Sequence, residues 1–168
     1  MEYLSPYEPK KKRPTLLTVL AILTFIGSGF FFLTYVIMAF SQDMWPAVIE
    51  TMQNMGQPDM VIELYEQFAV IPGTKYLLVA IAHALAIVGA ALMLKLNKIG
   101  FHIYVASQIL LFCVRNFIIG GVLKIGTLGI LEIVLFIVLY AINYKYMINP
   151  AKAGGADPEE DLPENEQF

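Results

Sequence analysis

Four long stretches of the chain carry apolar residues almost without interruption, and polar segments separate them. They run over residues 15–40, 76–94, 99–121 and 125–146. The first two hold no charged residue, the third holds only Arg115, and the fourth holds only Glu132 before a terminal lysine. A helix needs about 20 apolar residues to cross a hydrocarbon core about 30 Å thick. The pattern therefore predicts an all-α fold, a four-transmembrane-helix bundle.

The segment between the first two spans has a different pattern, with apolar residues at helical spacing and acidic residues between them. The stretch WPAVIETM places Trp45, Val48, Ile49 and Met52 on one face. After GQP, Asp59 is a suitable cap for a second helix. The apolar side of that helix would hold Met60, Val61, Leu64, Tyr65 and Phe68. Both helices are too short to cross the bilayer, so we expect a helical cap over residues 44–71, packed on the ends of the spans.

Composition and charge agree with a membrane protein and suggest its orientation. Apolar residues make up 58% and charged residues 15%, against roughly half and a quarter in soluble domains. Lysine and arginine gather at residues 10–13, 95–98 and 145–152, whereas residues 41–75 hold five acids and one lysine. The positive-inside rule therefore predicts cytoplasmic termini and an outer loop. The expected organisation is a basic lead-in over 1–14, a membrane domain over 15–148, and a disordered acidic tail over 149–168.

Arg115 and Glu132 are the charges that fall inside the apolar stretches. The third and fourth stretches would form a hairpin that turns near residues 123 and 124. Residues at equal depth then have numbers that add up to about 247, as 115 and 132 do. A charge inside a membrane is costly unless it is paired or hydrated. The sequence thus predicts a salt bridge between Arg115 and Glu132.

Other polar residues continue along the same helix faces. Tyr104 and Gln108 share a face with Arg115, and Tyr140 and Asn143 share a face with Glu132. The same numbering places Tyr104 level with Asn143, which predicts a polar seam between the two spans. On the second span, His83 lies near the depth of the charged pair. His83, Arg115 and Glu132 together form the candidate intramembrane polar site.

The first two spans offer further positions of interest. Thr24, Ser28 and Tyr35 lie on one side of the first span. Ala82, Ala86 and Ala90 form a stripe of small residues on the second span, which permits close helix approach.

Signatures of catalysis and cofactor binding are missing. The chain has no H-E-x-x-H, C-x-x-C, G-x-G-x-x-G, P-loop or G-x-S-x-G motif. Its single cysteine, Cys113, excludes an intrachain disulfide and a cysteine-based zinc cluster. No basic surface with interleaved aromatic residues suggests nucleic-acid binding. We therefore expect no enzymatic activity, no metal and no cofactor, and a protein whose partners are the lipid bilayer and another membrane protein or a second copy of itself.

Two functions remain open on this evidence. The favoured one is a non-catalytic accessory, assembly or interaction subunit, in which the polar seam only fixes how the helices pack. The alternative is a small transporter or channel that uses the seam between spans three and four. A structural seam would be dry and tightly packed, whereas a transport pathway requires a water-accessible cavity around His83, Arg115 and Glu132.

Residues 10–30, KKKRPTLLTVLAILTFIGSGF, carry one family resemblance. They resemble the first helix of small four-span (tetraspan) integral membrane proteins of bacteria that have no assigned activity. The resemblance covers about an eighth of the chain. It implies a location in the bacterial cytoplasmic (inner) membrane and no particular activity.

Overall fold

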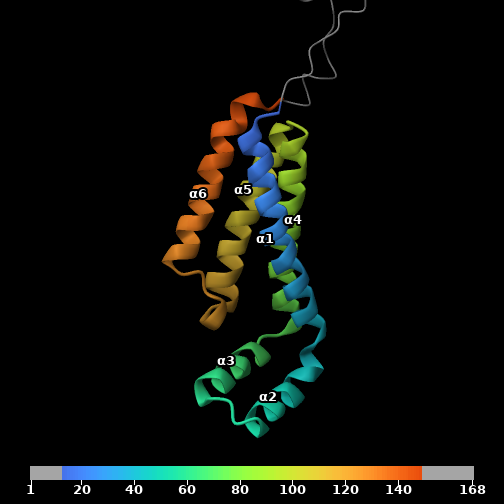
Figure 1. The fold of residues 1–168 in the computed structure, drawn as a ribbon, viewed down its shortest axis with the longest axis vertical. Helices are drawn as coiled ribbons and strands as arrows, with labels where there is room; N and C mark the ends of the chain where they lie inside the picture. The colour runs from blue at the N-terminus through green and yellow to red at the C-terminus, as the bar shows by residue number, and fades with distance from the viewer. Residues whose placement is uncertain (1–12, 149–168) are drawn as a thin grey trace, which may run out of the picture.

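The computed structural model of the chain describes residues 13–148, and helices dominate it (Figure 1). The α-helices are α1 (Thr15–Phe40), α2 (Trp45–Asn54), α3 (Asp59–Ala69), α4 (Gly73–Leu94), α5 (Lys98–Cys113) and α6 (Thr127–Asn143). A π-helix, Val114–Ile119, extends α5, and a 3-10 turn follows at Gly121–Leu123. The predicted acidic tail and most of the basic lead-in lie outside the described residues.

Four of these segments are long and apolar enough to cross a membrane: Thr15–Phe40, Gly73–Leu94, Lys98–Ile119 and Gly121–Tyr146. The expected all-α fold with four spans and two short helices is confirmed. The chain is an integral membrane protein with four candidate spans.

Local sequence explains where the spans begin. Pro14 precedes α1 and Pro72 precedes α4, and a proline restricts the backbone just before a helix without removing a helical hydrogen bond. Asn97 caps α5, since its side-chain oxygen accepts a hydrogen bond of 2.9 Å from the backbone of Ile99. Between α5 and α6, Gly120 adopts a φ of 66°, which favours glycine and ends the helix.

Helix α4 lies at the centre of the tightly packed part of the bundle. Its alanine stripe is at most 1% exposed, and Ala86 and Ala90 of this stripe pack in one cluster with α1 residues such as Leu20 and Ala21. On another face, α4 and α5 touch through their backbones. A Cβ atom on Gly100 would lie 2.6 Å from both the carbonyl oxygen of Gly89 and the backbone nitrogen of Met93. The absence of side chains at these two glycines therefore allows the close approach.

Helix α6 packs more loosely than the other spans. Only Tyr140 and Asn143 are buried along its length. In Figure 1 the end of α6 that begins at Thr127 leans away from the other spans. Its exposed apolar residues, which suit contact with lipid, are Leu128, Ile130, Leu131, Val134, Leu135, Val138 and Ile142.

The two short helices project beyond one end of the bundle, called here the loop end (Figure 1). They pack on each other, with the rings of Trp45 and Tyr65 centred 6.2 Å apart. The cap meets the bundle at the end of α3, where Phe68 packs against the core and its carbonyl oxygen accepts a 2.8 Å hydrogen bond from the Tyr76 hydroxyl. Neither short helix has a fully buried residue.

Less of α3 packs against the spans than the sequence suggested. Met60 was expected on the packed face, yet it is 80% exposed, and Leu64 is exposed as well. The hydrophobic pattern shows which side of a helix is apolar, but it does not show how much of that side finds a partner. Phe68, in the last turn of α3, packs against the core of the bundle.

Candidate functional site: a polar cavity within the bundle

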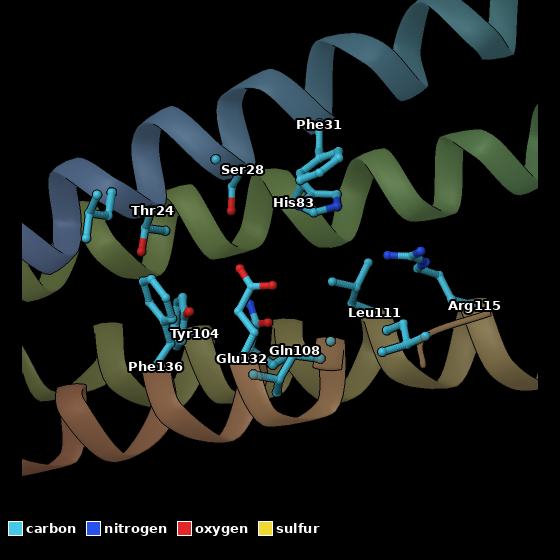
Figure 2. Close-up of a pocket in the computed structure, with 15 residues that line it drawn as sticks. Thr24, Ser28, Phe31, His83, Tyr104, Gln108, Leu111, Arg115, Glu132 and Phe136 are labelled. Carbon is cyan, nitrogen blue, oxygen red and sulfur yellow. The ribbon is translucent and has the colours of Figure 1, made fainter. Parts of the chain in front are cut away.

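A cavity of about 170 Å³ lies between α1 and α4 on one side and α5 and α6 on the other (Figure 2). We call it the polar cavity. Its lining residues are Leu23, Thr24, Gly27, Ser28, Phe31, His83, Tyr104, Gln108, Leu111, Arg115, Ile125, Gly129, Glu132, Ile133 and Phe136. All three residues of the predicted polar site belong to this set. A single water occupies about 30 Å³ in the liquid, so the space holds several waters or one small solute.

His83 reaches the polar cavity from α4 and is held between aromatic rings. Its imidazole stacks on Phe31 and Tyr35 of α1, with ring centres 5.4 and 5.8 Å away. The side chain is only 7% exposed, and its Nε2 atom has no hydrogen-bond partner. A buried polar group without a partner costs about 1–3 kcal/mol. The imidazole is therefore held in place beside the cavity with one ring nitrogen unsatisfied.

Arg115 does not form the predicted ion pair. Its Nε donates a 2.6 Å hydrogen bond to the carbonyl oxygen of Leu123, in the turn between α5 and α6. In Figure 2 its guanidinium lies toward the loop end of the cavity, apart from the carboxylate of Glu132. In the described part of the chain, residues 13–148, no salt bridge joins Arg115 and Glu132. The two charges share one cavity instead.

The pairing fails because α6 is displaced along α5 relative to the expected register. The ring of Tyr104 packs edge-on against Tyr140, with centres 4.7 Å apart, whereas the sequence placed Tyr104 level with Asn143. The difference of three residues corresponds to about 4.5 Å along a helix. Asn143 instead bonds within its own helix, through a 2.8 Å hydrogen bond to the carbonyl oxygen of Leu139. The π-helix and the turn before Thr127 alter the register, and a count along two ideal helices ignores them.

Glu132 projects from the loosely packed helix α6. Figure 2 shows its carboxylate directed toward Ser28 of α1, with Gln108 of α5 alongside. The residue is exposed in the folded chain, as are Leu23 and Phe31 across the cavity. These exposed lining residues lie on α1 and α6, so the cavity opens between these two helices.

The cavity is closed toward the opposite end of the bundle, where α1 begins and α6 ends. The hydroxyls of Thr24 and Tyr140 share a 2.8 Å hydrogen bond between α1 and α6, and Tyr104 packs edge-on against Tyr140. We call these three residues the tyrosine layer. Beyond it lies a dry cluster that includes Leu17 and Met93, both with no exposed surface. The cavity is therefore closed toward this end, and its opening lies between α1 and α6.

The sequence identified most polar residues of this site but not the residues that form its apolar walls. Gln108 and Tyr104 of the predicted seam line the cavity, and Tyr140 contacts Tyr104. Gly27 and Phe31 were not singled out, although they follow Thr24 at helical spacing. A Cβ atom on Gly27 would have nothing within 4 Å. This glycine therefore contributes empty space to the site rather than a close helix contact.

Two further observations limit the chemistry. In the described part of the chain, no group of three or more His, Cys, Asp or Glu side chains could hold a metal ion. A second cavity, of about 310 Å³, lies at the loop end between α1 and α2, and its walls, which include Ile37, Met38 and Trp45, are mainly apolar. Only the first cavity combines charged groups with depth in the bundle.

No protein-family model, curated protein sequence or solved structure matches this chain.

Proposed function

We propose that this protein is a small membrane transporter that takes a polar solute into the polar cavity, as one step in moving it across the bilayer. The observation that carries this proposal is the cavity itself, which places His83, Arg115 and Glu132 around open space within the bundle. The proposal involves no catalytic step. It locates the protein in a bacterial cytoplasmic membrane, with both termini inside, as the lysine and arginine distribution favours.

The state of the charged groups supports transport over a purely structural seam. Residues that only fix helix packing satisfy one another, because an unpaired polar group in a bilayer core is costly. Among residues 13–148, Arg115 and Glu132 are not paired with each other, and the Nε2 of His83 has no hydrogen-bond partner. Groups arranged in this way are suited to bonding with water or a solute.

The closed layer at the end of the bundle opposite the loop end also fits a carrier. A carrier exposes its site to one side of the membrane at a time, with a closed layer on the other side. The tyrosine layer and the dry cluster behind it provide such a barrier. In this state the cavity opens between α1 and α6, so the solute would enter it there.

Access of water to the cavity provides the test. In a Cys113→Ser background, Ser28→Cys places a thiol on the cavity wall, and Phe30→Cys places one on the outer face of α1, where Phe30 is 66% exposed. A water-soluble methanethiosulfonate reagent reacts with thiolates, which form in water and not in lipid. In proteoliposomes we expect rapid reaction at position 28 and little at position 30.

A cavity-filling change provides the matched control. Gly27→Phe adds a ring where the cavity is open, whereas Gly29→Phe adds the same ring at a neighbouring glycine that also has nothing within 4 Å. The first substitution should block labelling of Ser28→Cys, and the second should not. Equal, slow labelling at positions 28 and 30 would show that the cavity is dry, and the transport proposal would fail.

An assembly role is the second candidate, and the exposed apolar face of α6 favours it. A span that buries only Tyr140 and Asn143 has most of its surface free for a partner helix. Oxidative crosslinking of Leu135→Cys in membranes tests self-association, with Leu33→Cys on α1 for comparison. A dimer formed only through position 135 would support an assembly through α6.

A further inference from the structure

We propose that the ligand of the polar cavity is a small zwitterion, whose anionic group binds Arg115 and His83 and whose ammonium group binds Glu132. This inference rests on the proposed function, since it assigns a ligand class to the same cavity. It follows from three features: two opposite charges that are not paired with each other, a buried imidazole nitrogen without a partner, and the small size of the space.

The anion-binding half lies toward the loop end. The hydrogen bond from Arg115 Nε to Leu123 fixes the side chain, and within residues 13–148 the remaining guanidinium N–H groups have no hydrogen-bond partner. His83 lines the same cavity, and it adds a second donor when its Nε2 carries the proton and the ring turns this atom toward the ligand. A guanidinium with several N–H donors matches the oxygens of a carboxylate or phosphate.

The cation-binding half lies deeper in the bundle. The carboxylate of Glu132 is directed toward Ser28 and lies beside Gln108 (Figure 2). The amide nitrogen of Gln108 donates to Ser107 Oγ at 3.4 Å, which leaves its carbonyl oxygen free to accept. An ammonium group has three N–H donors and no acceptor, so a carboxylate with a neighbouring hydroxyl and amide oxygen suits it.

Neither half is suited to a simple ion. A lone cation at Glu132 would leave His83 and the remaining N–H groups of Arg115 without an acceptor, and a lone anion would leave the carboxylate without a donor. A ligand that carries both charges satisfies both halves at once and adds no net charge to the membrane interior.

Size and access narrow the ligand further. Pockets for drug-sized molecules usually span about 300–1,000 Å³, and this cavity is about 170 Å³. It therefore suits a molecule of a few heavy atoms or the headgroup of a larger one. A free amino-acid-like solute and a zwitterionic lipid headgroup share this chemistry. The opening between α1 and α6 admits either of them.

The test uses the full-length protein in nanodiscs of phosphatidylglycerol, a lipid without an ammonium group. Glycine, acetate and methylammonium serve as soluble probes, because the last two carry the separate charges of the first. A ligand that binds only the folded state raises the unfolding temperature, and near saturation we expect roughly 3 °C or more for glycine. Acetate and methylammonium, alone or together, should each give less than a third of that shift.

A second arm separates the two sources of the zwitterion. If the ligand is a lipid headgroup, replacing half of the phosphatidylglycerol with phosphatidylethanolamine should raise the unfolding temperature, and added glycine should then have no effect. If the ligand is a free solute, the lipid exchange should have no effect. Either result supports a zwitterion.

Single substitutions test which residues form each half of the binding site. Glu132→Gln and His83→Phe should each abolish the shift, since the first removes the carboxylate and the second keeps a stacking ring without its nitrogens. Glu63→Gln, on the exposed face of α3, should leave the shift unchanged and is the matched control. Retention of the full shift in Glu132→Gln would show that the probe binds elsewhere.

Two results would overturn the inference. An equal shift with methylammonium alone would show a cation site, and no shift with any probe or lipid would show that the cavity does not bind zwitterions. In both cases rapid labelling of Ser28→Cys would still support the transport proposal, whereas a dry cavity would remove both.

Discussion

Arg115 donates a hydrogen bond from Nε to the carbonyl oxygen of Leu123, and this contact joins the end of the third span to the turn that precedes the fourth. The arginine sits in a π-helix, where the usual helical pattern is interrupted, and such segments occur frequently at functional sites. The bond explains how a guanidinium is positioned in an apolar stretch without an ion-pair partner. It also leaves Glu132 to be satisfied by something other than Arg115.

The first prediction concerns the energetic independence of Arg115 and Glu132. Because the two side chains form no salt bridge, Arg115→Leu should destabilise the protein mainly by removing the bond to Leu123, a loss of about 1.5–3 kcal/mol. The losses in Arg115→Leu and Glu132→Leu should add in the double variant to within about 0.5 kcal/mol. Chemical denaturation in detergent measures all four proteins. Recovery of stability in the double variant would instead indicate that the two residues pair.

The second prediction tests the close contact between α4 and α5. Gly100→Ala places a methyl group against the backbone of Gly89 and Met93, which cannot move aside as a side chain can. Overpacking of this kind typically costs about 1–3 kcal/mol. Gly29→Ala is the control, because its new methyl group meets nothing within 4 Å. Thermal unfolding should separate the two variants clearly, and equal stability would show that the helices do not approach so closely.

Most of the fold could be predicted from the sequence because the bilayer imposes a simple length rule. The first span was expected over 15–40, and α1 covers those residues. The alanine stripe on α4 was expected at a close helix contact, and its residues are buried. Both predictions depend on local composition alone.

The contacts between α5 and α6 could not be predicted in the same way. The predicted depth of Glu132 assumed two regular helices and a tight turn, but a π-helix and an extended stretch at Lys124 intervene. Nothing in the sequence marks a π-helix. The Gly89–Gly100 contact was also missed, because these glycines lie on different spans and only the folded chain brings them together.

The third prediction concerns how the cap is attached. Phe68 packs against the core of the bundle, whereas Leu64, one turn earlier, is exposed. Phe68→Ser should therefore release α3 and increase proteolysis between residues 41 and 75, while Leu64→Ser should not. Limited proteolysis in proteoliposomes measures the difference. Equal protection in both variants would mean that the hydrogen bond from Tyr76 to the Phe68 carbonyl holds the cap by itself.

The fourth prediction tests the orientation in the membrane. In the Cys113→Ser background, Glu63→Cys on α3 should react with an impermeant thiol reagent in intact cells. Lys95→Cys, between α4 and α5, should react only after the cells are opened. Both positions are exposed, so accessibility within the fold does not bias the comparison. The reverse pattern would contradict the orientation inferred from the distribution of lysine and arginine.

The last prediction concerns the tyrosine layer. Tyr140→Phe keeps the ring that packs edge-on against Tyr104 and removes the hydroxyl that forms a hydrogen bond with Thr24. Hydrogen bonds between membrane helices contribute about 0.6 kcal/mol on average. A double-mutant cycle with Thr24→Val should therefore give a coupling energy of about that size, measured by unfolding in detergent. No coupling would show that the two hydroxyls do not bond in the membrane.

The same residues allow a test of the closed side of the cavity. Tyr140→Ala removes the ring as well as the hydroxyl, so it should open a path from the polar cavity toward the opposite end of the bundle. We expect proteoliposomes that contain this variant to leak a small polar dye, whereas Tyr140→Phe should remain tight. Leu139→Ala, at the neighbouring half-buried position, is the control for general loosening of α6. Leakage in Tyr140→Ala alone would place the barrier at the tyrosine layer, and tight vesicles in every case would show that the dry cluster around Leu17 and Met93 closes the path without it.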